Sequence, residues 1–355
     1  MTRKLQNHCD ELDYFNACAC ILVVLIHVLS PGISGLRPGS WQMAAVYFPW
    51  RLSGFVVPAF LFCGAVKMGL LFASGREFRY GRYIRQRIVK IYIPYLAANA
   101  VYYVIFLRIN YVAGDFPREL VKYILLGNLS SPFYYVIIVM QFYLLAPVWR
   151  TLAERLPWHI GLLSALFFTF VFLRSSAVLR LFGVEFPYAD RIFPTYLWFW
   201  MAGLYAGKYY ARVQAALKEA GWKLCLYAAA VCGLFAFLSY FQFSSGQYIY
   251  DLDTLKAFSD SLSVFLLLRV CTGVRDGRRE WLRRFGKRVH SASYFVYLSH
   301  CLFLTLCAAF LSRLGIERLS LTLLLRAVIA YGAAFGLYFL LQSAVRKLPD
   351  LRRGR

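Results

Sequence analysis

Acidic side chains are scarce in this chain. Its 355 residues include 17 Asp and Glu against 40 Lys and Arg, which gives a formal net charge of +23. Charged residues make up only 16% of the chain, whereas they make up about 25% of soluble globular proteins. Hydrophobic residues make up 60%, and the mean hydropathy is +0.55. This composition excludes an ordinary soluble domain and indicates a polytopic membrane protein.

The usual motifs of disulfide scaffolds and soluble enzymes are missing as well. The nine cysteines form no CxxC pair, and most lie in or at the ends of apolar runs, so we interpret them as small packing residues. No serine-hydrolase elbow, Walker loop, HExxH or dinucleotide fingerprint is present. We therefore expect no bound cofactor and no metal. Asp10, Glu11 and Asp13 precede a long apolar run, which is unlike a cleavable signal peptide.

The excess positive charge has two possible interpretations. In a soluble protein it would suggest nucleic acid, but no soluble segment here is long enough to carry the usual binding modules, so we expect no nucleic-acid partner. Lys and Arg instead gather in the connectors 74–90 and 275–290 and at the C-terminal end. By the positive-inside rule this predicts that both termini are cytoplasmic and that the lipid bilayer is the surrounding partner.

Hydropathy predicts an all-α membrane helix bundle of about ten spans. We expect one membrane-embedded domain over 1–355, without an appended soluble domain. The predicted spans are 13–30, 50–73, 87–107, 133–149, 159–179, 195–210, 222–241, 255–273, 291–312 and 320–344.

The first span contains a histidine in an otherwise apolar run, LDYFNACACILVVLIHVLS. An ionisable side chain inside a span is costly and usually faces a bundle interior or a water-filled cavity, so we predict a functional role for His27 rather than packing alone. Imidazole suits general-base work near neutral pH. At about 100° per residue, Asn16 lies on nearly the same face as His27, about 16 Å away.

A basic segment, GRYIRQRIVKIYIPY, precedes the third predicted span. Arg87 and Lys90 are one turn apart, with Arg85 beside them, and such cations pair well with phosphate. We interpret them as a clamp for a phosphorylated ligand. The alternative is that they only set topology and contact anionic lipid.

Two further spans carry polar side chains. Ser293, Tyr297 and His300 share one face of the ninth span, with Ser299 nearby, and polar groups at this depth need partners inside the bundle. Helix-to-helix hydrogen bonding is the alternative role for this set. In the fourth span, Gln141 is a candidate member of the same supporting polar face, although we interpret it as mainly structural.

Aromatic residues are frequent in the predicted outer loops. Trp41, Tyr47, Tyr188 and Tyr248 are candidates for sugar contact, because aromatic rings near charged side chains are typical of sugar-binding clefts. The alternative is that they anchor the protein at the membrane interface.

With these residues laid out, the chain resembles the acyltransferase-3 family of integral membrane acyltransferases over nearly its whole length. The resemblance rests on an ordered set of motifs: Leu12-Asp13 followed by Val23-Val24 and His27, the VPAFLFCG segment, the basic stretch ending in Pro94-Tyr95, the run from Gln141 to Pro147, and the run from Ser293 to His300. No single motif is specific, whereas their order is.

The resemblance implies a bacterial cytoplasmic membrane enzyme that moves an acyl group, generally acetyl, from cytoplasmic acyl-CoA to a glycan hydroxyl, with polysaccharide-assembly proteins as possible partners. His27 matches the family's essential histidine, and Arg87 and Lys90 match its Arg-x-x-Arg donor pair. Asn16 stands where the family often has Arg or Lys, and an amide supplies no charge. The alternative function is an exporter of a glycan or lipid-linked sugar, with His27 as a proton relay.

Overall fold

The computed structural model describes residues 9–109, 111–112, 118–184, 188–316 and 318–347. Within these residues the chain is helical and contains no β-strand, as the sequence predicted. The chain divides into two compact units. Unit 1 contains residues 57–219, and unit 2 contains residues 9–56 and 220–355, so the first predicted span belongs to the same unit as the C-terminal helices.

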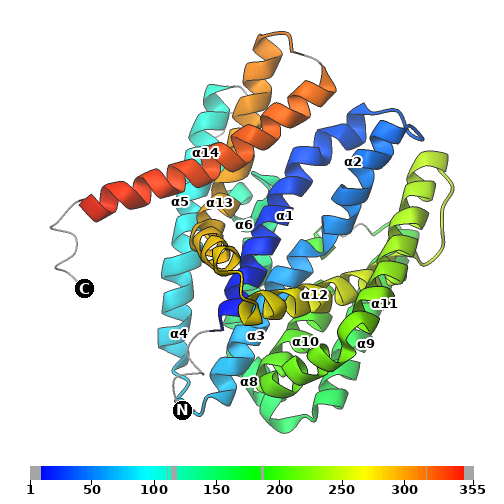
Figure 1. Ribbon diagram of the computed structural model, residues 1–355, viewed down its shortest axis with the longest axis vertical. Helices are drawn as coiled ribbons and strands as arrows, with labels where there is room; N and C mark the ends of the chain where they lie inside the picture. Colours follow the sequence, from blue (N-terminus) through cyan, green and yellow to red (C-terminus); the bar gives the residue numbers. More distant parts are fainter. Residues whose placement is uncertain (1–8, 110, 113–117, 185–187, 317, 348–355) are drawn as a thin grey trace. The chain divides into compact units, whose positions relative to one another are not determined.

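Unit 1 holds the helices from α3 to α10, drawn from blue-cyan to green in Figure 1. Their bounds are α3 (Val56–Ala73), α4 (Tyr80–Arg87), α5 (Ile93–Arg108), α6 (Arg118–Leu126), α7 (Tyr134–Leu144), α8 (Ala146–Arg155), α9 (Trp158–Leu181) and α10 (Leu197–Lys208). Shorter turns join them, namely η2 (Ile88–Tyr92), η3 (Ser131–Phe133), η4 (Ala189–Arg191) and η5 (Phe193–Tyr196).

Unit 2 combines the two ends of the chain. It holds α1 (Asp10–Gly35), α2 (Trp41–Leu52), η1 (Ser53–Phe55), α12 (Leu252–Asp276), α13 (Glu280–Arg313), α14 (Leu319–Lys347) and most of α11 (Tyr210–Ser245). Helix α1 packs against α2, α12, α13 and α14, and is the central helix of this unit.

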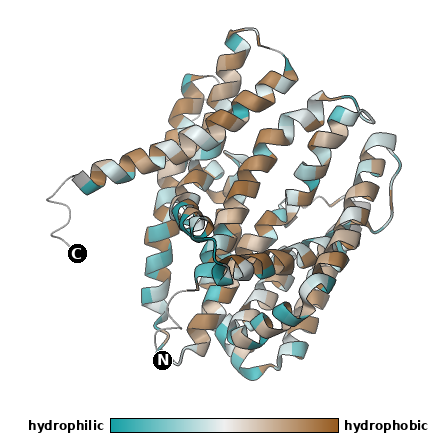
Figure 2. Cartoon of the chain, viewed as in Figure 1, coloured by the Kyte–Doolittle hydropathy of each residue, from teal (hydrophilic) through white to brown (hydrophobic). Residues whose placement is uncertain are grey.

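Eight helical segments in the described residues are long and apolar enough to cross a membrane, and a ninth is added if α6 and η3–α7, bent by 59°, form one broken span. Figure 2 shows the apolar residues in brown along these helices. The predicted span 195–210 corresponds to α10, whose 12 residues are too short to cross a bilayer core of about 30 Å alone. The multi-span helical fold is confirmed, and the count of ten stays a prediction.

Helix α11 is broken where the two units meet along the chain. Gly221 has φ 49° and ψ −125°, a conformation outside the helical region that side chains with a Cβ rarely adopt. Hydropathy placed the start of this span at residue 222, one residue after this break, because the preceding stretch carries Arg212, Lys218 and Glu219. The positive φ therefore allows the chain to change direction one residue after the unit boundary.

Close approach of two helices organises unit 1. On α3 and α10, Gly69, Gly203 and Gly207 leave no room for a Cβ, because the partner helix's backbone occupies that space. Small residues allow membrane helices to pack backbone to backbone. Beside this contact, the buried Trp200 ring stacks on Phe142 of α7 with centroids 4.3 Å apart, which fixes α10 against α7.

Candidate functional site

The polar residues of α1 and α13 meet in one line, which we call the polar seam. His290 Nε2 lies 3.1 Å from Asp13 Oδ1, and the His27 and His300 rings lie 5.2 Å apart. Between these pairs, Cys20 Sγ donates to the Ser293 backbone oxygen of α13 at 3.6 Å. Residue numbers rise together along both helices, so α1 and α13 run parallel. The two polar stripes that the sequence showed separately therefore form a single helix–helix interface.

At one end of the seam, His27 and His300 differ in burial and in hydrogen bonding. His27 is half-buried, and its ring forms no hydrogen bond with the residues that the structure describes. His300 is fully buried, and its Nδ1 lies 2.8 Å from the Val296 oxygen. Because a carbonyl oxygen only accepts, Nδ1 carries the hydrogen and Nε2 of the neutral ring carries the lone pair. Nε2 lies 3.4 Å from Cys301 Sγ.

Arg326 of α14 holds this end of the seam from the other side. Its guanidinium donates to the backbone oxygens of His27 and Leu304, each at 3.3 Å, and so links α1 to α13. One helical turn further, Tyr331 Oη donates to the Ile21 oxygen at 2.8 Å. These bonds show that the Arg326 guanidinium is directed into the helix interface.

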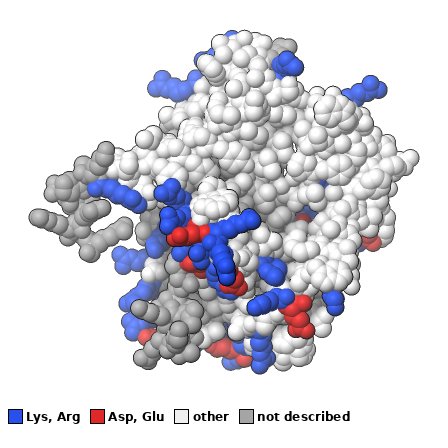
Figure 3. Space-filling view, in the orientation of Figure 1, with Lys and Arg blue, Asp and Glu red and all other residues white. Residues whose placement is uncertain are grey.

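Ion pairs close the opposite end of the seam. Arg275 of α12 contacts the buried Glu11 at 2.6 Å, and Lys287 of α13 contacts Asp10 at 2.8 Å. Figure 3 shows blue and red side chains gathered around the start of α13. These pairs fix the first turn of α1 against α12 and α13. The acidic residues that distinguish this N-terminal segment from a signal peptide therefore have a structural role.

The remaining seam candidates differ in what their side chains do. Ser293 and Ser299 donate back to oxygens of their own helix, so they do not need a partner on another helix. Tyr297 is buried and stacks on Tyr294. Asn16 is half-buried on α1, on the stripe that carries His27. Of the predicted polar face, His300 is thus the member that the structure brings to His27.

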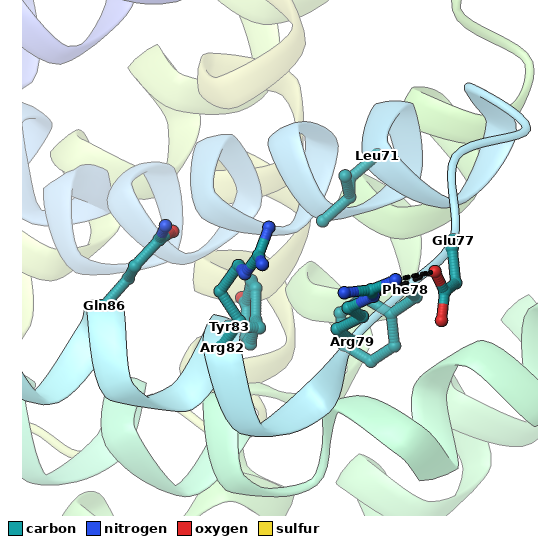
Figure 4. Close-up of a pocket in the computed structure, with 7 residues that line it drawn as sticks. All are labelled: Leu71, Glu77, Phe78, Arg79, Arg82, Tyr83 and Gln86. Carbon is teal, nitrogen blue, oxygen red and sulfur yellow. Dashed lines mark hydrogen bonds and ion pairs between the residues drawn. The ribbon is translucent and has the colours of Figure 1, made fainter.

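The predicted basic segment lies in unit 1, on α4 and the π-turn η2. Arg82, Arg85, Gln86, Val89 and Lys90 line an open hollow of about 410 Å³. A second hollow, of about 390 Å³, shares Arg82 and Gln86 with the first and extends toward α3. Figure 4 shows this second hollow, with the Arg82 and Gln86 side chains on one side of α4 and the Arg79–Glu77 ion pair at its far end. We call Arg82, Arg85 and Lys90 the basic row.

Arg87 points away from the basic row. Its guanidinium lies 4.8 Å from the centre of the Tyr83 ring and 4.9 Å from that of Tyr143, between α4 and α7. The sequence paired Arg87 with Lys90 on one face of a regular helix. The π-turn from Ile88 to Tyr92 changes that spacing, and Arg87 does not line either hollow.

Of the other candidates, Gln141 and Tyr47 have structural contacts. Gln141 Nε2 donates to the Arg191 oxygen at 2.8 Å, and its Oε1 accepts from the Phe193 backbone at 3.1 Å, so both ends of the amide hold the η4–η5 segment in unit 1. Tyr47 is buried and bonded to Ser239 at 2.7 Å, whereas Trp41 is 75% exposed.

Sequence reasoning missed four residues at these sites. Cys301 lies in the predicted ninth span, His290 one residue before it and Arg326 in the tenth, but nothing in their spacing relates them to α1. Arg82 could have been found, because Arg79, Arg82 and Arg85 recur every three residues on one helix.

Comparisons with known proteins identify a family for this chain. The family described as "Acyltransferase domain" matches residues 10–342. The Bacillus subtilis protein YfiQ, described as a membrane-bound acyltransferase, is 22% identical over 232 residues, which cover 62% of this chain and 62% of YfiQ. The chain thus matches less than two thirds of that relative's length. No solved structure matches the chain.

Proposed function

Because this chain belongs to the acyltransferase-3 family of membrane acyltransferases, we propose that it moves an acyl group, of the acetyl type, from cytoplasmic acyl-CoA to a hydroxyl of a cell-surface or lipid-linked glycan. The family assignment itself confirms the resemblance seen in the sequence. The donor, the acceptor and the residue roles are our proposals. A bacterial cytoplasmic membrane and polysaccharide-assembly partners follow from the same family resemblance.

His27 is the proposed general base. It takes the proton of the glycan hydroxyl as that oxygen attacks the thioester carbonyl, and the proton then passes to the departing CoA sulfur. The observation that supports this role most is that the half-buried His27 ring has no hydrogen bond to another described residue, so its ring nitrogens remain free for a substrate. Arg326 fixes the backbone of His27, and fixed geometry is what a base requires.

The donor's phosphates are proposed to bind at Arg85 and Lys90, together with Arg82. Guanidinium and ammonium groups form charge-assisted hydrogen bonds with phosphate, and these three line one hollow. Arg87 and Asn16 remain candidates for donor contact. Because the basic row and His27 belong to different units, each role is proposed on the contacts of its own unit.

The experiment compares His27→Gln and His27→Ala with wild type in cells, and measures glycan acylation by mass spectrometry normalised to the amount of membrane-inserted protein. Both variants are expected to lose about 10²–10⁴-fold, because Gln keeps hydrogen bonding but cannot cycle a proton. The exposed His159 supplies the matched control, and His159→Gln is expected to acylate normally. Wild-type acylation by a well-inserted His27→Gln protein would refute the assignment. Loss of the glycan itself would favour the exporter.

A further inference from the structure

We propose that His27, His300 and Cys301 form a binding site for a zinc ion. Each offers one ligand atom, and these atoms all lie within 4.8 Å of one another. Two imidazoles and one thiolate are a ligand set that zinc accepts, with a fourth position left for water. The site joins α1 to α13 across the polar seam, so its first ligand lies far in sequence from the other two.

The orientation of His300 suits this role. Its Nδ1 donates to the Val296 oxygen at 2.8 Å, which leaves the Nε2 lone pair facing Cys301 Sγ at 3.4 Å. A metal-bound histidine generally donates its other ring hydrogen to a carbonyl or carboxylate, because that bond fixes the ring and its tautomer. Zinc binds nitrogen at about 2.0–2.1 Å and sulfur at about 2.3 Å, so two ligands of a tetrahedral ion lie roughly 3.3–3.7 Å apart. His300 and Cys301 already meet that spacing.

The half-buried His27 completes the site by moving inward by about 1 Å, a side-chain adjustment within reach of the ring. The Arg326 guanidinium is the cation beside the site, and it is hydrogen-bonded to two backbone oxygens. Zinc binding converts the Cys301 thiol to a thiolate, releasing one proton per ion, and the thiolate offsets part of the local positive charge.

A bound zinc ion would occupy the lone pair of His27. If His27 is the base, zinc would therefore inhibit acyl transfer rather than support it. This consequence is the part of the inference that rests on the proposed function. The packing interpretation of the nine cysteines would hold for the others but not for Cys301. Metal binding itself needs no substrate, and it can be measured whether or not acyl transfer is detected.

The test uses the full chain, purified in detergent with a tag that contains no histidine and stripped of metal with a chelator. Zinc binding is measured by competition with a chromophoric indicator, and cobalt(II) absorption reports thiolate coordination. About one tightly bound ion per chain is expected. Cys301→Ser and His300→Ala should each weaken zinc binding by about tenfold or more. Cys307→Ser, which removes another buried thiol of α13, is the matched control and should bind like wild type.

Two results would overturn the site. One is a zinc affinity that Cys301→Ser leaves unchanged, and the other is a cobalt complex without a thiolate band. Thermal unfolding of Cys301→Ser and Cys307→Ser, measured with and without zinc, separates lost ligation from lost folding. Only the loss of a site ligand should remove the zinc-induced rise in melting temperature, whereas a folding defect lowers the melting temperature of the metal-free protein. In a parallel assay zinc should inhibit wild-type acylation, and Cys301→Ser should resist zinc relative to its own metal-free rate. Absence of acylation in every sample would count against the proposed function and leave the binding result standing.

Discussion

The polar seam of unit 2 and the basic row of unit 1 are both built from polar side chains on membrane helices, but they are assembled in different ways. The pairs that define the seam join two helices, as in His27 with His300 and Asp13 with His290. The basic row lies on one short helix and its adjoining turn, and its members are exposed. Its arrangement follows from local helix geometry alone.

This difference predicts how each region responds to change. A seam residue is held by partners on other helices, so displacing one partner shifts the others, and effects should be large and confined to particular positions. Exposed cations act mainly through screened electrostatics, so their effects should be small, similar in size and sensitive to salt. The predictions below test this contrast, from the largest expected effect to the smallest.

Arg326→Met should give the largest loss outside His27 itself. It removes the hydrogen bonds from Arg326 to the His27 and Leu304 oxygens, and a displacement of about 1 Å at a base costs roughly 10²-fold in rate. The loss should fall on kcat and leave KM for the donor unchanged, with partial rescue in Arg326→Lys. Arg346→Met, an exposed cation of the same helix, should behave like wild type. A loss confined to the amount of inserted protein would reduce Arg326 to a structural role.

Gly286→Leu should separate α1 from α13. A Cβ at Gly286 would meet the Tyr14 ring at 2.6 Å, and overpacking of this kind costs about 1–3 kcal/mol. Thermal unfolding in detergent should show a clear drop in melting temperature. Gly336→Leu on α14 is the matched control, because nothing lies within 4 Å of that position. Equal melting temperatures for the two variants would contradict the close α1–α13 contact.

Single changes in the basic row should have modest and similar effects. Arg82→Gln, Arg85→Gln and Lys90→Gln should each raise KM for acyl-CoA about fivefold, since one exposed ion pair contributes at most about 1 kcal/mol. The increases should multiply in the triple variant and shrink at high salt. Arg155→Gln, an exposed cation elsewhere in unit 1, serves as the control. Salt-independent affinity in the triple variant would assign the row to topology only.

Arg87→Lys should have the smallest effect on donor binding. Lysine keeps the charge but loses the planar group that stacks between Tyr83 and Tyr143, at a cost of about 0.5–1 kcal/mol in stability. We expect a slightly lower melting temperature and a donor KM within about twofold of wild type. A tenfold rise in KM with unchanged stability would show that Arg87 contacts the donor directly.

Most of the fold could be predicted from the sequence because membrane spans obey a one-dimensional rule. A run of apolar residues long enough to cross the bilayer can be counted without knowing its neighbours, so α1, α12, α13 and α14 were all expected. Helix α10 does not follow this rule. It has only 12 residues, and it packs closely on α3 instead of being long enough to cross the bilayer by itself.

The candidate site likewise has parts that the sequence could predict and parts that depend on helix packing. His27, His300 and the basic segment were found because an ionisable group in an apolar run, or a cluster of cations, stands out against its immediate sequence. Whether His300 meets His27, whether Arg326 enters the interface and whether Arg87 faces away from Lys90 depend on helix packing and on one π-turn.

The sequence by itself determined the membrane-embedded helical class, the family motifs and which residues were chemically unusual, since each of these is a property of composition and local spacing. The tertiary structure decided the partners. It placed Cys301 beside His27, although these residues are separated by most of the chain. The physical reason is that hydrophobicity sets where a helix forms, whereas the side chains packed between two helices set which of its faces meets which neighbour.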